Sequence, residues 1–255
     1  MQRGKIIGAV VLVAAVGLVL AQQFGLFGTT GSDTGSAGAP ATAGTAVMPA
    51  AGAPAPAPAD AVPGRIFTVD AAQSEVYWRI YKAGAMARLG HNHVISIGEL
   101  SGEVVLGADP ASSAWDLSFP VAGLSVDDPA IRARHGEDFE SVPSEDDKAG
   151  TKSNMLTEAV LNGEQFPEIR LSGQGFSGTF DAAELPVTIE LLGRRIERRF
   201  PAMVRIDGDA LIVTGEYRLT HDDFGMTPFS LLGGIISVGN EIDFSYRIHA
   251  VAGGR

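Results

Sequence analysis

The chain has 255 residues, 45% of them hydrophobic, which is enough to bury a substantial core and excludes a protein that is disordered throughout. The formal net charge is −11 at pH 7 and falls entirely after residue 64, because the four charged residues before that point cancel. Such an acidic segment repels phosphates, which disfavours nucleic-acid binding. Cysteine is absent, which excludes disulfides, thiolate metal sites and a cysteine nucleophile.

The first 28 residues have the pattern of an export segment. Arg3 and Lys5 precede sixteen uncharged, mostly apolar residues, Ile6 to Ala21, which as a helix would span roughly 24 Å. This length lies between a cleavable signal peptide and a membrane anchor, and small residues at 19–21 leave cleavage open. We expect an apolar helix at residues 6–28 that anchors the protein in the inner membrane, with the rest of the chain in the periplasm.

Residues 29–64 consist almost wholly of Gly, Ala, Pro, Ser and Thr, without periodicity. This composition cannot bury a core and predicts a disordered, flexible to semi-extended linker. A tether of this kind is most useful when the segment before it stays in the membrane. We therefore divide the chain into an anchor or signal (1–28), a linker (29–64) and a folded domain (65–255).

The folded domain is dominated by apolar residues that alternate with polar ones, which is typical of strands with one buried face. The expected strands are 74–81, 98–106, 115–121, 169–176, 185–191, 195–206, 211–219 and 242–248. A helix is predicted at Thr151–Gly163, capped by Ser153 or Asn154 and closed by Gly163. About eight strands of similar length predict an all-β sandwich or closed barrel.

Two of the five histidines, His91 and His93, stand one residue apart after Gly90. On an extended segment their imidazoles would share a face about 7 Å apart, close enough to hold a metal ion together. Two ligands are too few, and the sequence does not show which other side chain would join them. The simpler hypothesis, which we favour, is that Gly90 makes a turn and the histidines lie at a strand start near one rim.

Other polar clusters have ordinary interpretations. His221 is followed by Asp222 and Asp223, but the chain has no G-x-S-x-G elbow, so a hydrolytic triad is disfavoured. The acidic segment 135–150 lacks the ordered D-x-D-x-D-G pattern of a calcium loop. The arginines between residues 194 and 199 fit a solvated strand face, with contact to lipid headgroups as the alternative.

An eight-stranded barrel is either filled by its own side chains or holds one small ligand. Trp, Phe, Tyr, Val and Ile on the inner face favour an apolar guest. Periodicity alone does not decide between a barrel filled by its own side chains and a hollow one.

Four stretches share motifs with one known family: FTVDAAQSEVYWRI (67–80), ARLGHNHVISIGELSGEV (87–104), MLTEAVLNGEQFPEIRLSG (155–173) and YRLTHDDFGMTPFSLLGG (217–234). On these motifs, residues 66–251 resemble the YceI family of periplasmic, lipocalin-like domains associated with polyisoprenoid binding, in a branch that carries GHNH. Gln73 and the segment 189–193 depart from the family by lacking a usual histidine. The resemblance implies an extended antiparallel barrel with a helix at one side and a long lipid tail in its pore.

The sequence thus predicts an exported eight-stranded antiparallel barrel with one short helix. It is expected to bind an amphiphilic lipid, a polyisoprenoid or a quinone, for transport or storage, with no catalytic residue and no cofactor. The membrane is a second expected partner, through the N-terminal segment, and a homodimer is left open. Two rival hypotheses are a metal- or haem-binding protein that uses His91 and His93, and a structural or interaction domain with a solid core. The side chains predicted to line the lumen are Trp78, Ile80, Leu117, Phe119, Val187, Ile189, Val213, Tyr217, Phe244 and Tyr246.

Overall fold

The computed structural model describes residues 64–253, which form one antiparallel sheet of thirteen strands. The expected export segment (1–28) and linker, up to residue 63, lie outside the described residues. In chain order the strands are β1 (Gly64–Val69), β2 (Glu75–Ala83), β3 (His93–Ile97), β4 (Ser101–Gly107), β5 (Ala114–Pro120), β6 (Leu124–Val126), β7 (Glu168–Gln174), β8 (Ser177–Thr179), β9 (Ala182–Leu191), β10 (Arg194–Asp207), β11 (Ala210–Thr220), β12 (Ser230–Leu231) and β13 (Ile236–Ala252).

Eight of these strands close into a barrel. Their order is β1-β4-β5-β7-β9-β10-β11-β13, and β13 pairs back onto β1 with Phe67 opposite Ala252. Closure satisfies the backbone groups that an open sheet would leave at its edges. The extended eight-stranded antiparallel barrel predicted from the sequence is therefore confirmed.

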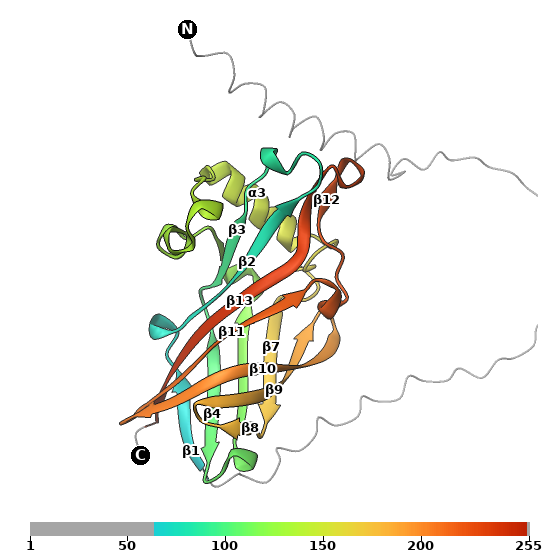
Figure 1. The fold of residues 1–255 in the computed structure, drawn as a ribbon. Helices are drawn as coiled ribbons and strands as arrows, with labels where there is room; N and C mark the ends of the chain where they lie inside the picture. The colour runs from blue at the N-terminus through green and yellow to red at the C-terminus, as the bar shows by residue number, and fades with distance from the viewer. Residues whose placement is uncertain (1–63, 254–255) are drawn as a thin grey trace, which may run out of the picture. The chain divides into compact units, whose positions relative to one another are not determined.

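Three long strands of the barrel wall are each interrupted and so count as two strands: β1 with β2, β3 with β4, and β5 with β6. Beyond its pairing with β1, β13 pairs along the same edge with β2, which continues to β3 and then β6. The breaks lie at the turn Ala71–Gln73, at residues 98–100 and at the turn Val121–Gly123. The barrel thus extends at this end as the strands β2, β3 and β6, and α3 (Glu145–Leu156) lies beside them, away from the end that holds β1, β4 and β8 (Figure 1).

Short helical segments cover the outside of the wall near β2 and β3. They are α2 (Pro129–Arg132) and the single-turn helices Ala133–His135 and Glu137–Phe139. Ile131 and Phe139 pack there against Tyr77 and Val94, whose side chains point outward from β2 and β3. This outer cluster is separate from the larger apolar cluster inside the barrel.

All eight strands expected from alternation are present in the structure, with end points shifted by a few residues. Alternation did not reveal β1, β3, β6, β8 and β12, because runs of two to six residues are too short to show a period.

The predicted helix Thr151–Gly163 was placed too late in the chain. The helix α3 begins after Ser144, whose hydroxyl accepts a hydrogen bond from the Asp147 amide while the Asp147 carboxylate accepts one from the Ser144 amide. This capping box lies in the acidic stretch that was interpreted as a loop. No helix within residues 64–253 has the length and apolarity needed to cross a bilayer.

Candidate functional site

A cavity of about 430 Å³ lies inside the barrel, within the range of small-molecule sites. Every strand of the closed ring except β1 contributes to its lining, together with β2, β3 and α3. Leu211 and Val213 near the start of β11 line the cavity, and so does His221 just past the strand's end, so the lining spans roughly 30 Å at the usual strand rise. The rival hypothesis of a solid core is therefore wrong, since the interior is hollow and elongated.

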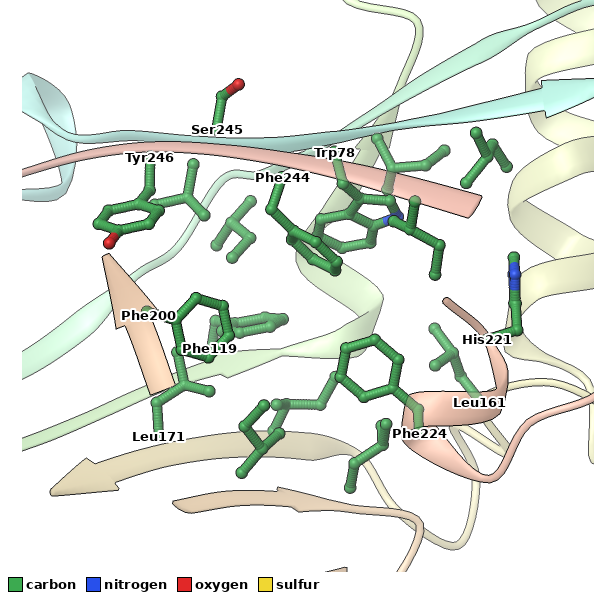
Figure 2. A pocket seen from close by; sticks show the side chains of 18 of the residues that line it. Trp78, Phe119, Leu161, Leu171, Phe200, His221, Phe224, Phe244, Ser245 and Tyr246 are labelled. Atoms are coloured by element: carbon green, nitrogen blue, oxygen red, sulfur yellow. The ribbon is translucent and has the colours of Figure 1, made fainter. Parts of the chain in front are cut away.

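Aromatic and aliphatic side chains from opposite walls point toward one another across this space (Figure 2). The rings of Trp78 and Phe244 lie 5.8 Å apart between centroids, and Phe224 lies 6.0 Å from Phe244. Ser245 points to the other side of β13 from its neighbours Phe244 and Tyr246 (Figure 2). The alternation expected of β13 therefore holds, and the structure shows which face is luminal.

Nine of the ten side chains predicted to face the lumen line the cavity: Trp78, Ile80, Leu117, Phe119, Val187, Ile189, Val213, Phe244 and Tyr246. Tyr217 does not. Its ring packs edge-on against Phe200, 5.5 Å away, and Phe200 lines the cavity at that position. Contact of these side chains with a lipid stays a prediction.

Other lining residues escaped the sequence analysis for identifiable reasons. Trp115 and Leu171 belong to expected strands and share faces with predicted lining residues, so the alternation could have found them. Ile95 lies on the undetected β3. Phe224 lies on a turn, where no periodicity marks an inward direction.

The basic and imidazole groups of the lining gather at one end. His93 on β3 lies opposite Ile80 on β2, Ile80 lies opposite Ile242 on β13, and His221 follows the end of β11. Lys82 and His91 join them, as do Thr151 and Asn154 of α3. Among the described residues, no carboxylate and no arginine lines the cavity. The cavity is therefore amphiphilic, with a long, mainly apolar body and one end that carries the basic and imidazole groups.

Each residue of the GHNH turn has a structural role. Gly90 ends the helical turn Ala87–Leu89, and His93 begins β3, so the expected turn at a strand start is confirmed. His91 Nδ1 lies 3.2 Å from the Ser141 hydroxyl, and burial lowers the pKa of His91. Asn92 accepts a hydrogen bond from the Lys82 amide and donates one to the Asp138 carbonyl. The turn is thereby held to β2 on one side and to the outer layer on the other.

His93 is held by a buried carboxylate. Its Nδ1 lies 2.7 Å from Asp127 Oδ2, and the Asp127 side chain is 0% exposed. Asp127 Oδ1 accepts hydrogen bonds from Arg132 Nη1 at 2.7 Å and from the Val94 amide at 2.9 Å. Burial alone would raise the pKa of Asp127, but the hydrogen bonds from His93 and Val94 hold it below its ordinary value. The carboxylate therefore stabilises the fold at neutral pH, and this contribution is lost as the pH falls through the lowered pKa.

A metal site at His91 and His93 gains no support from the geometry. Their ring centroids are 6.3 Å apart, but within residues 64–253 no group of three or more His, Cys, Asp or Glu is placed to hold a metal ion.

The carboxylates next to His221 do not orient it. Its Nδ1 lies 3.1 Å from the Asn240 backbone carbonyl, whereas Asp222 accepts from the side-chain Nδ2 of Asn240 and Asp223 accepts from the Thr220 hydroxyl. Burial lowers the pKa of His221. The arginines at 194–199 lie on β10, where Arg195 forms an ion pair with Glu190. Arg194, Arg195 and Arg199 are exposed, as expected of a solvated strand face, whereas Arg198 is partly buried and pairs with Asp223.

The Asp127–Arg132 pair predicts a large stability effect. Arg132→Met leaves the carboxylate buried with one partner fewer, and we expect the free energy of unfolding to fall by about 3–5 kcal/mol. The matched control is Arg134→Met, because Arg134 pairs with Glu75 on the surface, with both side chains substantially exposed. That change should cost about 1 kcal/mol or less. Urea denaturation measures both, and equal losses for the two variants would contradict this account of the network.

Comparisons with known proteins agree with this architecture. The sequence model of the YceI-like domain matches residues 67–250. No curated protein matches the chain. Among solved structures, Burkholderia cenocepacia BcnA is 13% identical with a TM-score of 0.52, over 72% of this chain and 99% of that one. A polyisoprenoid binding domain from Saccharophagus degradans is 10% identical with a TM-score of 0.46, over 73% and 98%. The Campylobacter jejuni YceI protein is 9% identical with a TM-score of 0.46, over 63% and 85%. The chain belongs to the YceI-like domain family.

Proposed function

We propose that the protein binds one amphiphilic lipid with a long isoprenoid-type tail, either a polyisoprenoid or a quinone, inside the barrel. The observation that carries this proposal is the elongated, mainly apolar cavity whose basic and imidazole groups gather at one end. The shape fits a guest with a long hydrocarbon part and a small polar part. An isoprenoid tail is also what the family resemblance implies.

Burial of the lipid tail in the apolar cavity can drive binding without any covalent or catalytic step. Removing apolar surface from water contributes about 25 cal/mol for each Å², so burying roughly 400 Å² of tail contributes about 10 kcal/mol before the cost of ordering. We therefore propose transport or storage of the lipid, with no catalytic step.

We also propose that the protein acts in the periplasm, held to the inner membrane by residues 6–28 with residues 29–64 as a tether. The composition of both segments supports this. The mass of the intact protein from the membrane fraction tests it, and we expect a chain that still begins at Met1. Soluble protein that begins after Ala21 would contradict the anchor. A homodimer is a separate expectation, which light scattering on the full chain tests and a monomer mass contradicts.

Lipid retention tests the central proposal. Solvent extraction and mass spectrometry of the purified full-length protein should find about one long-tailed amphiphilic lipid per chain. Phe119→Asp places a carboxylate in the apolar lining, where an unpaired charge costs several kcal/mol, and should reduce the retained lipid at least about tenfold.

The matched control is Ser118→Asp, one residue earlier on β5. The Ser118 hydroxyl lies 3.4 Å from that of Ser101 on the adjacent strand, on the outer face of the sheet. This variant should retain lipid at the wild-type level. Full retention by a folded Phe119→Asp protein, or wild-type protein without any extractable lipid, would contradict the proposed function.

A further inference from the structure

The side chain of His93 faces the polar end of the cavity. On β3 the residues His93, Ile95 and Ile97 line the cavity, whereas Val94 packs into the outer cluster. The alternation of the strand thus aims the imidazole inward. The side chain is only 15% exposed, so it lies in a largely enclosed position.

The position of the proton on His93 follows from its partner. Asp127 is ionised, and an ionised carboxylate only accepts hydrogen bonds. Nδ1, 2.7 Å from Asp127 Oδ2, must therefore carry a hydrogen. In a neutral imidazole, Nε2 is then a hydrogen-bond acceptor. None of the described residues donates to this atom, so in the neutral imidazole its lone pair is available to a guest.

The fold holds Asp127 in place despite backbone strain. Its φ of 56° is left-handed, which is unfavourable for a residue other than glycine. The Asp127 amide donates to the Val94 carbonyl at 2.7 Å, while the carboxylate binds the Val94 amide and Arg132. Strain of this kind persists where surrounding contacts over-determine the position, and it gathers at functional sites. Here it fixes the carboxylate that orients His93.

The local charge disfavours a phosphate guest. Arg132 neutralises Asp127 through a 2.7 Å contact, and partial burial lowers the pKa of His91. Lys82 supplies one cation, and its Nζ donates to the Gly90 carbonyl at 3.2 Å. No arginine of the described chain reaches the lining, although arginine forks are the usual partners of phosphate oxygens. The polar end is therefore better suited to a neutral headgroup.

We propose that His93 Nε2 accepts a hydrogen bond from a hydroxyl group on the lipid, so that the cavity selects a prenyl alcohol, phenol or quinol over the corresponding phosphate ester. This inference rests on the proposed function and specifies the headgroup. His93 is the specificity-determining residue, and Asp127 and Arg132 are its positioning residues.

Three probes with the same tail test this assignment: geranylgeraniol, its methyl ether and its monophosphate. The ether keeps the oxygen but loses the hydrogen-bond donor. Delipidated full-length protein should bind the alcohol about three- to tenfold more tightly than the ether, which is the range of one net hydrogen bond. It should bind the monophosphate no more tightly than the alcohol. Isothermal titration calorimetry measures the three affinities.

Substitutions assign the preference to one residue. His93→Phe should make the alcohol and ether affinities equal while ether binding stays within about twofold of wild type. His91→Phe, which changes the neighbouring imidazole, should keep the preference. Loss of packing alone would weaken the binding of both probes and leave the ratio of the alcohol and ether affinities unchanged.

The outcomes separate the two proposals. Equal binding of alcohol and ether by the wild type, tighter binding of the monophosphate, or a preference abolished by His91→Phe but not by His93→Phe overturns the role of His93 and leaves lipid binding intact. Failure of the wild type to bind any of the probes overturns both. The wild-type comparison needs no substitution, so it decides even if His93→Phe does not fold.

Discussion

The hollow interior depends on the last strand, β13, which hydrogen-bonds on both edges. One edge pairs with β11, and the other pairs first with β2 and then, near the strand's end, with β1. The pairing with β1 closes the ring and leaves no sheet edge there. Once the ring is closed, strand alternation alone directs the Phe244 side chain into the lumen and the Ser245 side chain to the opposite face of β13. Without that closure the apolar inner face would meet water.

The interrupted strands of the barrel wall explain how a polar site is added to an apolar barrel. Where β5 gives way to β6, the chain can place Asp127 directly after a short strand and next to β3. The outer layer then supplies Arg132, whose side chain also reaches the Asn92 and Ser141 carbonyls. One buried network thus joins the covering helices, the GHNH turn and the cavity wall. The paired histidines belong to this junction.

Most of the barrel could be predicted from the sequence, because long strands with one buried face carry a period of two that tertiary context does not erase. The side chains that face the lumen could be predicted from the same period. The prediction was wrong for Tyr217, because Phe200 packs against its ring and lines the cavity at that position. The network of His93 could not be predicted, since Asp127 is 34 residues away in sequence and follows a three-residue strand. The start of α3 was missed because its capping box is made of residues that are equally common in loops.

Tryptophan emission tests the central claim that an elongated guest lies inside the barrel. The chain has two tryptophans, and both Trp78 and Trp115 line the cavity. Bromine atoms on a bound tail would lie close to one or both indoles. Titration of delipidated protein with a brominated long-chain alcohol is predicted to remove most of the emission and to saturate near one equivalent. Binding of the alcohol with emission unchanged, or no binding at all, would contradict a guest in the lumen.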